Sequence, residues 1–202
     1  MDEGIGRVLQ ALRDAGAQEN TLVVFTSDNG GERFSDMWPL VGKKRDLLEG
    51  GIRVPYLARW PARVAPGGVS AQHAITMDWV ATFLEAAGAA PHPDYPLDGL
   101  SLLANLGEPK ALVERELFWR MKFREQKAVR AGRWKWLSIE GHEYLFDLEK
   151  DPRERANLAK RQPQRLLDLR RRYLDWEASL PPIPGDAKVT LIGGPQEVAH
   201  PS

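Results

Sequence analysis

The sequence predicts an α/β fold that is followed by a smaller subdomain, an antiparallel sheet with one helix. Three observations support this prediction. Apolar residues recur with helical spacing over residues 2–15. A continuous apolar run at residues 22–25 lies between polar turn signals, which is typical of a strand buried on both faces. After residue 116, short aromatic-rich segments are separated by turn signals, which is typical of an antiparallel meander.

The first half of the chain divides into two helices and two strands around a long loop. Gly16 and Gly88 follow the helical patterns, and glycine is a common helix terminator. The loop between residues 29 and 51 is polar and contains several glycines, and its length favours a functional segment over a simple connection. The expected elements are helices at 2–15 and 78–87 and strands at 21–27 and 54–60.

The second half begins after a proline-rich connector at residues 91–98. Turn signals at Ala131-Gly132 and Glu140-Gly141 separate the short strands. Pro163 suits the first turn of a helix, and an apolar stripe follows it on the face opposite several arginines. The expected elements are strands at 117–121, 127–130, 134–139 and 144–147 and a helix at 163–180.

Composition excludes several classes of partner. The 202 residues have a net charge of zero and a pI near 6.9, so no basic field attracts nucleic acid or an anionic membrane. No apolar stretch approaches the roughly 20 residues that span a bilayer. The chain has no cysteine, which excludes disulfides and thiolate metal sites. Residues 1–4 lack the features of a signal peptide, and the compartment stays unknown, with a periplasmic or secreted location open for a complete protein.

Asp28 and Asn29 directly follow the first predicted strand. Ligands of open α/β sheets gather beyond the carboxyl ends of strands, and both side chains offer oxygen atoms to a hard cation such as calcium or magnesium. The alternative interpretation is an Asx-turn after the strand. Two ligands do not complete a calcium site, because Ca²⁺ takes about 6–8 oxygens.

Several motifs in order resemble one known family. SDNG at residues 27–30 is followed by Lys44, five residues before EGGIRVP at 49–55. Four further segments continue the pattern, at residues 72–78, 97–103, 128–135 and 145–152. Together they resemble the C-terminal part of the type I, formylglycine-dependent sulfatases of the alkaline phosphatase superfamily, over roughly residues 1–180. The resemblance implies a sulfatase catalytic-domain part at 1–107, an antiparallel-sheet subdomain with its helix at 108–180 and a tail at 181–202.

The resemblance also implies roles for three residues. Asp28 and Asn29 match metal ligands, for Ca²⁺ or another divalent cation, and Lys44 matches a lysine that contacts the sulfate. Lys43 is the alternative if the loop shifts by one residue, and a solvated basic run is the rival interpretation. The family's nucleophile is a formylglycine made within a C/S-x-P-x-R segment. This chain lacks that segment, since its only Ser-x-Pro, beginning at Ser179, is followed by isoleucine where arginine is required.

The resemblance therefore implies a fragment of a sulfuric ester hydrolase that acts on a small-molecule or carbohydrate sulfate ester. We expect the isolated chain to be inactive and to associate with itself through an exposed sheet surface. The first alternative is a phosphonate or phosphodiester hydrolase of the same superfamily. The second is a non-catalytic truncated chain with a structural or binding role.

The remaining conspicuous residues are interpreted mainly as structural. Glu49 and Arg53 are expected to pair and fix the loop, and the glycines at 50 and 51 are expected to permit tight or positive-φ backbone. His73 is interpreted as a packing residue. The weaker candidates for substrate contacts are Trp38, Trp119 and Arg124.

Overall fold

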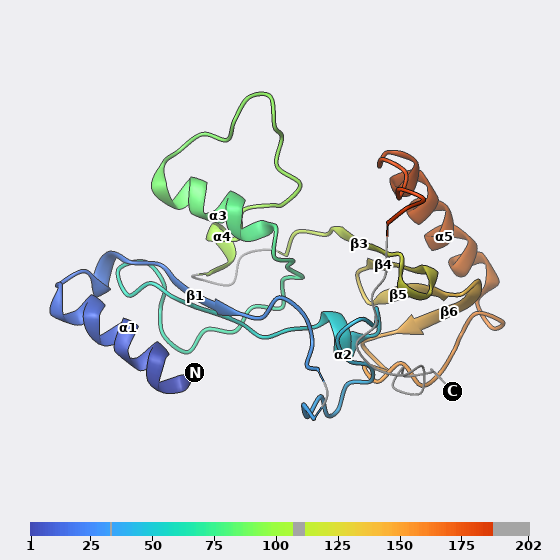
Figure 1. Cartoon of the computed structure of the whole chain (residues 1–202), viewed down its shortest axis with the longest axis horizontal. Coiled ribbons are helices and arrows are strands. Elements are labelled where there is room, and N and C mark those ends of the chain that lie inside the picture. The colour runs from blue at the N-terminus through green and yellow to red at the C-terminus, as the bar shows by residue number, and fades with distance from the viewer. Residues whose placement is uncertain (33, 107–111, 188–202) are drawn as a thin grey trace. The chain divides into compact units, whose positions relative to one another are not determined.

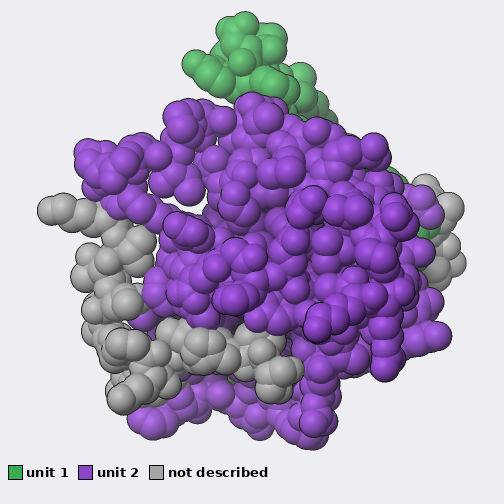
Figure 2. Space-filling view, turned by 90° about the vertical axis from the view of Figure 1, so that its right-hand side faces the viewer, with its two compact units in different colours: residues 1–27, 55–113 green, residues 28–54, 114–202 purple. Residues whose placement is uncertain are grey.

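The computed structural model describes residues 1–32, 34–106 and 112–187 (Figure 1). The chain forms two compact units (Figure 2). Unit 1 consists of residues 1–27 and 55–113, and unit 2 consists of residues 28–54 and 114–202. The mixture of helices and sheets confirms the predicted α/β class.

The division into units differs from a single boundary near residue 107 at one segment of the chain. Residues 28–54 precede that boundary in the chain, yet they group with the C-terminal sheet in unit 2. Chain order alone placed this loop in the first part, whereas its packing decides where it belongs. That residues 108–180 form a domain of their own stays a prediction.

Unit 1 contains a two-stranded ribbon and its helices. Strand β1 pairs antiparallel with β2, with Val23 opposite Arg59 and Thr26 opposite Tyr56. The predicted helices at 2–15 and 78–87 are present, and a short helix at 103–106 was not expected. The elements are α1 (Asp2–Asp14), the 3₁₀ turn η1 (Gln18–Asn20), β1 (Val23–Thr26), β2 (Tyr56–Arg59), α3 (Asp78–Ala87) and α4 (Leu103–Leu106).

Strand β1 is less buried than its apolar run alone indicates, as expected for a chain with an exposed sheet surface. The continuous apolar run predicted burial on both faces, but Val23, Val24 and Thr26 are half-buried and Phe25 is exposed. Within the described residues, β1 is bonded to β2 alone. A two-stranded ribbon cannot cover both of its own faces, which explains the difference.

The start of α3 is fixed by a buried carboxylate. Asp78 accepts hydrogen bonds from the backbone N–H groups of Ile75 (2.8 Å) and Leu100 (2.9 Å). Thr82 Oγ1 accepts a third bond, from the N–H of Leu102, at 2.8 Å. A Cβ at Gly99 would lie 2.3 Å from the carbonyl oxygen of Met77. Residues 72–78 and 97–103, two of the segments that carry the family resemblance in the sequence, are therefore hydrogen-bonded to each other.

The β1–β2 ribbon leads to a prediction about association. Phe25 and Leu57 are cross-strand partners, and their side chains are 37% and 62% exposed. An exposed apolar pair on a short ribbon favours contact with another copy. We expect sedimentation velocity to detect association that weakens in Leu57→Lys. Val69→Lys, at a residue that is 92% exposed in a loop, should have no effect. A monomeric wild-type chain at all concentrations would contradict the prediction.

Unit 2 contains the predicted meander. Four strands lie in the order β3-β4-β5-β6, and each neighbouring pair is antiparallel. Pro163 occupies the first turn of the last helix, as expected. The elements are α2 (Glu49–Ile52), β3 (Glu116–Met121), the 3₁₀ turn η2 (Phe123–Glu125), β4 (Gln126–Ala131), β5 (Trp134–Ile139), β6 (His142–Asp147) and α5 (Pro163–Ala178).

Side chains of a strand alternate between the two faces of a sheet. In this sheet both faces are covered and buried. One face packs against α5, with Trp136 of β5 and Tyr173 of α5 in the same cluster. The other face carries Leu137 of β5 and packs against Leu47 and Leu48 of the long loop. The loop is therefore part of the core of unit 2.

The described part of the predicted tail is attached to β3 and the turn after it. Arg120 Nη2 donates to the carbonyl oxygen of Pro181 at 2.9 Å, and Lys122 Nζ donates to the carbonyl oxygen of Ala187. Residues 188–202 lie outside the described part. Among the described helices, none has the length and apolar character needed to cross a bilayer.

Candidate functional site

Backbone hydrogen bonds join the two limbs of the loop at residues 28–51. The first limb is residues 28–31, and the second limb is residues 41–51. The N–H of Gly30 donates to the carbonyl oxygen of Gly51, and the N–H of Lys44 donates to that of Gly31, each at 2.8 Å. A third bond, 2.7 Å long, runs from Gly50 to Val41. The segment that begins with Asp28 therefore lies beside the segment that carries Lys44.

The glycines of the loop are required by space. A Cβ at Gly30 would lie 1.8 Å from the carbonyl oxygen of Gly50, and a Cβ at Gly51 would lie 2.0 Å from that of Asp46. Neither Gly50 nor Gly51 has a positive φ, whereas Gly42 of the same loop has a φ of +89°. Of the two predicted reasons for the glycines at 50 and 51, tight backbone is therefore the one that applies.

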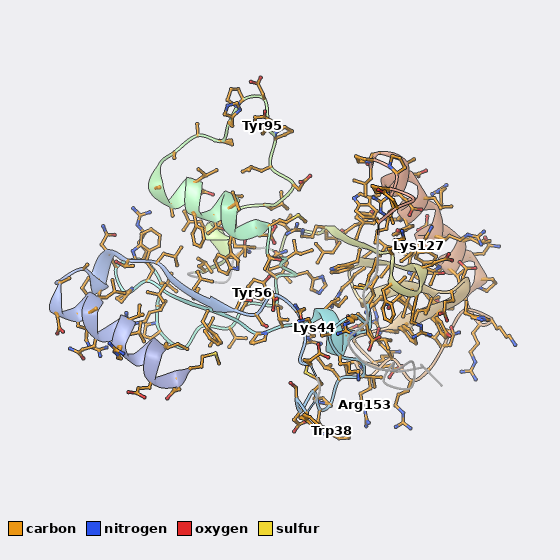
Figure 3. All side chains as sticks on the ribbon, viewed as in Figure 1. Trp38, Lys44, Tyr56, Tyr95, Lys127 and Arg153 are labelled. Atoms are coloured by element: carbon orange, nitrogen blue, oxygen red, sulfur yellow. The ribbon has the colours of Figure 1, made fainter. Side chains whose placement is uncertain are left out.

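The three predicted site residues all belong to unit 2. Asp28 is exposed and Asn29 is half-buried. Lys44 is labelled in Figure 3, and its Nζ lies 4.0 Å from Glu32 Oε2 with 46% of the side chain exposed. The backbone of Lys43 donates to Asp46 Oδ2 at 3.0 Å. Metal ligation by Asp28 and Asn29 and sulfate contact by Lys44 stay predictions.

The donor chemistry of Asp28 and Asn29 suits a hard cation. Within the described ranges, however, no group of three or more His, Cys, Asp or Glu side chains could hold a metal ion. The two residues thus fit as part of a coordination sphere and leave most of its oxygens to other donors.

A buried charge cluster holds the second limb to the sheet. Lys135 Nζ of β5 lies 3.0 Å from Glu49 Oε1 and 2.8 Å from Glu154 Oε1. Glu154 Oε2 accepts the backbone N–H of Glu49 at 2.6 Å, and Arg130 Nη1 lies 3.5 Å from Glu49 Oε2. The side chains of Lys135, Glu49 and Glu154 are at most 2% exposed. Two anions are thereby balanced by two cations.

The two carboxylates respond differently to burial. Burial alone would raise the pKa of Glu49, but Lys135 and Arg130 together hold it below its ordinary value. Burial raises the pKa of Glu154, and Lys135 offsets only part of that effect. Lys135 is therefore a cation that lowers the pKa of both carboxyls against the effect of burial.

This cluster corrects one prediction. Glu49 was expected to pair with Arg53, but its carboxylate pairs with Lys135 and Arg130. Arg53 is exposed and donates only its backbone N–H to the carbonyl oxygen of Glu49, at 2.7 Å. Residues 49–52 form a helical turn, and the carboxylate of Glu49 reaches the sheet instead.

A second buried side chain from the sheet holds the loop close to Lys44. Gln126, at the start of β4, is fully buried. Its Oε1 accepts the N–H of Leu47 at 2.9 Å, and its Nε2 donates to the carbonyl oxygen of Arg45 at 2.8 Å. Sequence reasoning missed Gln126, Lys135 and Glu154. The one available signal was a lysine between two tryptophans, at 134–136, in a buried strand.

The suggested substrate contacts differ in accessibility. Trp38 is 71% exposed, and the guanidinium of Arg153 lies 4.2 Å from the centre of its ring (Figure 3). Trp119 packs against the core beside the loop. Arg124 pairs with Glu140 at 3.1 Å, with 10% of its side chain exposed. Trp38 is thus the most accessible of the three, and His73 is half-buried, in line with a packing role.

Comparisons with known proteins give one consistent result. A family model described as Sulfatase matches residues 1–89. N-acetylgalactosamine-6-sulfatase of Homo sapiens is 39% identical over 125 residues, which cover 59% of this chain and 24% of that protein. Arylsulfatase A of Homo sapiens is 33% identical over 236 aligned positions, which cover 99% of this chain and 45% of that protein. The chain therefore spans less than half the length of these relatives.

A solved structure is similar over most of the chain. The structure of Ps i-CgsB in complex with k-i-k-neocarrahexaose matches with a TM-score of 0.76 and 30% identity. The match covers 87% of this chain and 40% of that one. The similarity thus extends well beyond the residues that the family model matches.

Proposed function

Because this chain belongs to the sulfatase family, with its alkaline-phosphatase-like fold, we propose that it supplies part of the active site of a sulfuric ester hydrolase. The observation that carries the proposal is the joined loop at residues 28–51. It brings the segment with Asp28 and Asn29 alongside Lys44 through two backbone hydrogen bonds of 2.8 Å. These are the three residues that match the family's site.

Lys44 is proposed to stabilise negative charge on the sulfate as its ester bond breaks. An ammonium is a compact point charge, and stabilisation of developing charge in a water-poor site is a large term in catalysis. Asp28 and Asn29 are proposed to hold the metal ion of the family, calcium or another divalent cation. Such an ion would neutralise charge on the sulfate oxygens.

The covalent nucleophile is proposed to lie in a separate segment. The 202 residues contain no C/S-x-P-x-R segment, and a nucleophile that forms a covalent intermediate divides one difficult step into two easier ones. The residues of this chain would then bind and orient the sulfate without attacking it.

The substrate class is proposed to be a sulfated carbohydrate. One relative is named for the 6-sulfate of N-acetylgalactosamine, and one similar structure was solved with a carrageenan-type oligosaccharide. Trp38 is an exposed aromatic residue in the same unit as Lys44. Which ester is cleaved is left to assay.

The test is the activity of the sulfatase that contains this chain. Lys44→Ala and Asp28→Ala should each lower kcat/KM for an aryl sulfate by about 10²–10³, the typical loss of one charge-stabilising group. Lys43→Ala is the control and should have little effect. The 202-residue chain alone should show no turnover, even with added calcium, because it lacks the nucleophile segment.

Three results would overturn the proposal. Full activity of Asp28→Ala and Lys44→Ala would remove the site. A large loss in Lys43→Ala alone would move the sulfate contact to that residue. Faster cleavage of a phosphonate monoester than of the aryl sulfate would favour the sister class of hydrolases.

A further inference from the structure

The backbone around Lys44 has an unusual conformation that something must hold. Arg45 has a φ of +80°, in the left-handed region that is unfavourable for a non-glycine residue. Its side chain makes only a loose ion pair, 3.7 Å from Glu32 Oε2. Strained backbone of this kind persists only where the surroundings determine it.

Two interactions hold this conformation: a local turn, in which the N–H of Asp46 donates to the carbonyl oxygen of Lys43 at 2.9 Å, and the side chain of Gln126. The amide of Gln126 bonds the carbonyl oxygen of Arg45 (2.8 Å) and the N–H of Leu47 (2.9 Å), two backbone groups at and shortly after the strained residue. Its Nε2 also reaches the carbonyl oxygen of Phe123 at 3.1 Å, which ties the amide to the turn before β4. Burying a side-chain amide costs free energy unless its donor and acceptor atoms are hydrogen-bonded. These bonds therefore favour one orientation of the Gln126 amide.

The bend at Arg45 is linked to the first limb of the loop through Lys44. Lys44 precedes Arg45, and its N–H bonds the carbonyl oxygen of Gly31 at 2.8 Å. Gly31 lies two residues after Asn29. A rotation of the bend at Arg45 would therefore move Lys44 relative to the segment that carries Asp28 and Asn29.

We propose that Gln126 is a positioning residue for Lys44, which fixes the bend at Arg45 and thereby the placement of the lysine against the segment at residues 28–31. The proposal rests on the function proposed above for its catalytic consequence. Its structural part, the dependence of the Lys44 segment on Gln126, stands without that function.

The structural part is tested by hydrogen exchange on the 202-residue chain. Gln126→Leu should lower the protection of the Leu47 and Lys44 amides by about tenfold or more, the loss expected when buried backbone groups lose their partner. Asn157→Ala is the matched control. The Asn157 amide also bridges backbone groups, the N–H of Leu145 and the carbonyl oxygen of Glu143, and its loss should leave Lys44 protected. Unchanged protection of Lys44 in Gln126→Leu would overturn the proposal.

The catalytic part is tested in the active sulfatase that contains this chain. Gln126→Leu should lower kcat/KM at least tenfold, and it should add little when Lys44 is already alanine, because residues acting through one another are not additive. Arg45→Asn should restore part of the activity of Gln126→Leu, since asparagine tolerates the left-handed region. Asn157→Ala should keep wild-type kinetics.

The outcomes separate the two proposals. If the losses from Gln126→Leu and Lys44→Ala multiply and Arg45→Asn restores nothing, Gln126 acts only on stability and the inference is wrong. If Lys44→Ala alone is fully active, the proposed function is wrong, while the exchange of Lys44 still decides the structural part.

Discussion

Replacing Lys135 with methionine should lower the free energy of unfolding of unit 2 by about 3–5 kcal/mol, the usual cost of removing one partner from a buried ion pair. Methionine is unbranched and nearly matches the apolar part of the lysine side chain in length, so little packing is lost. What is lost is the cation that lies 3.0 Å from Glu49 and 2.8 Å from Glu154. Arg130 would remain beside Glu49, 3.5 Å from its Oε2.

The loss in this variant should depend on pH. Burial already raises the pKa of Glu154, and without Lys135 we expect it to rise further above its unfolded value, while Glu49 loses the cation that most strongly opposes the effect of its burial. Around neutral pH the unfolded chain binds no proton at these groups, whereas the folded chain must either take up a proton or bury a charge. Stability then falls as the pH rises through the unfolded and then the folded pKa values. The variant should therefore be more destabilised at pH 8 than at pH 5.

Denaturant unfolding at the two pH values provides the measurement. Lys127→Met is the matched control, because Lys127 pairs with Glu177 at 2.9 Å while 35% of its side chain is exposed. Half-exposed pairs contribute about 0–1 kcal/mol. Equal stability losses in the two variants, or a Lys135→Met loss that shrinks toward pH 8, would contradict this account of the cluster.

A methyl group at Gly30 should disrupt the loop at residues 28–51. The added Cβ would lie 1.8 Å from the carbonyl oxygen of Gly50, and neither backbone can turn aside as a side chain would. The 2.8 Å bond from Gly30 to Gly51 should break as the limbs separate. We expect a stability loss of about 1–3 kcal/mol, as for other overpacked sites, and at least a tenfold weaker activation of the containing sulfatase by calcium.

Thermal unfolding and calcium titration of the activity would test the Gly30→Ala variant. Gly68→Ala is the control, because the nearest atom to its Cβ, the carbonyl oxygen of Ala65, is 3.9 Å away and the φ of Gly68 is not positive. It should behave as wild type. Normal stability of Gly30→Ala would contradict the prediction, because it would mean that the two limbs can separate without a loss of unfolding free energy.

Elements with local signals could be predicted from the sequence. The helix α3 begins and ends at the expected residues, and the meander of unit 2 has the expected strand order. These predictions depend on periodicity and turn residues, which act over a few positions. The apolar run of β1 is typical of a strand buried in a larger sheet, and its partial exposure agrees with the exposed sheet surface expected of this chain alone.

The candidate site could be predicted only in part. Asp28, Asn29 and Lys44 were identified by a motif pattern, and their roles stay predictions. The groups that hold the loop could not be found in this way, because Gln126 and Glu154 lie 79 and 105 residues from the backbone groups they bond. Lys135 stands between two tryptophans in a short strand, and this spacing does not tell whether its side chain faces solvent or the core. Only the packing of the loop on the sheet shows it to be buried.

The long sequence separation between the loop and its anchors has a consequence for synthesis on the ribosome. The backbone of Glu49 is bonded by Glu154, 105 residues later. At about 5–20 residues per second, the ribosome needs about 5–20 s to make that span. During this interval the nascent chain carries Asp28, Asn29 and Lys44 without the partners that fix their loop in the finished protein. Long-range contacts of this kind slow folding, so the segment with the proposed catalytic groups should reach its final arrangement late, after the sheet has emerged.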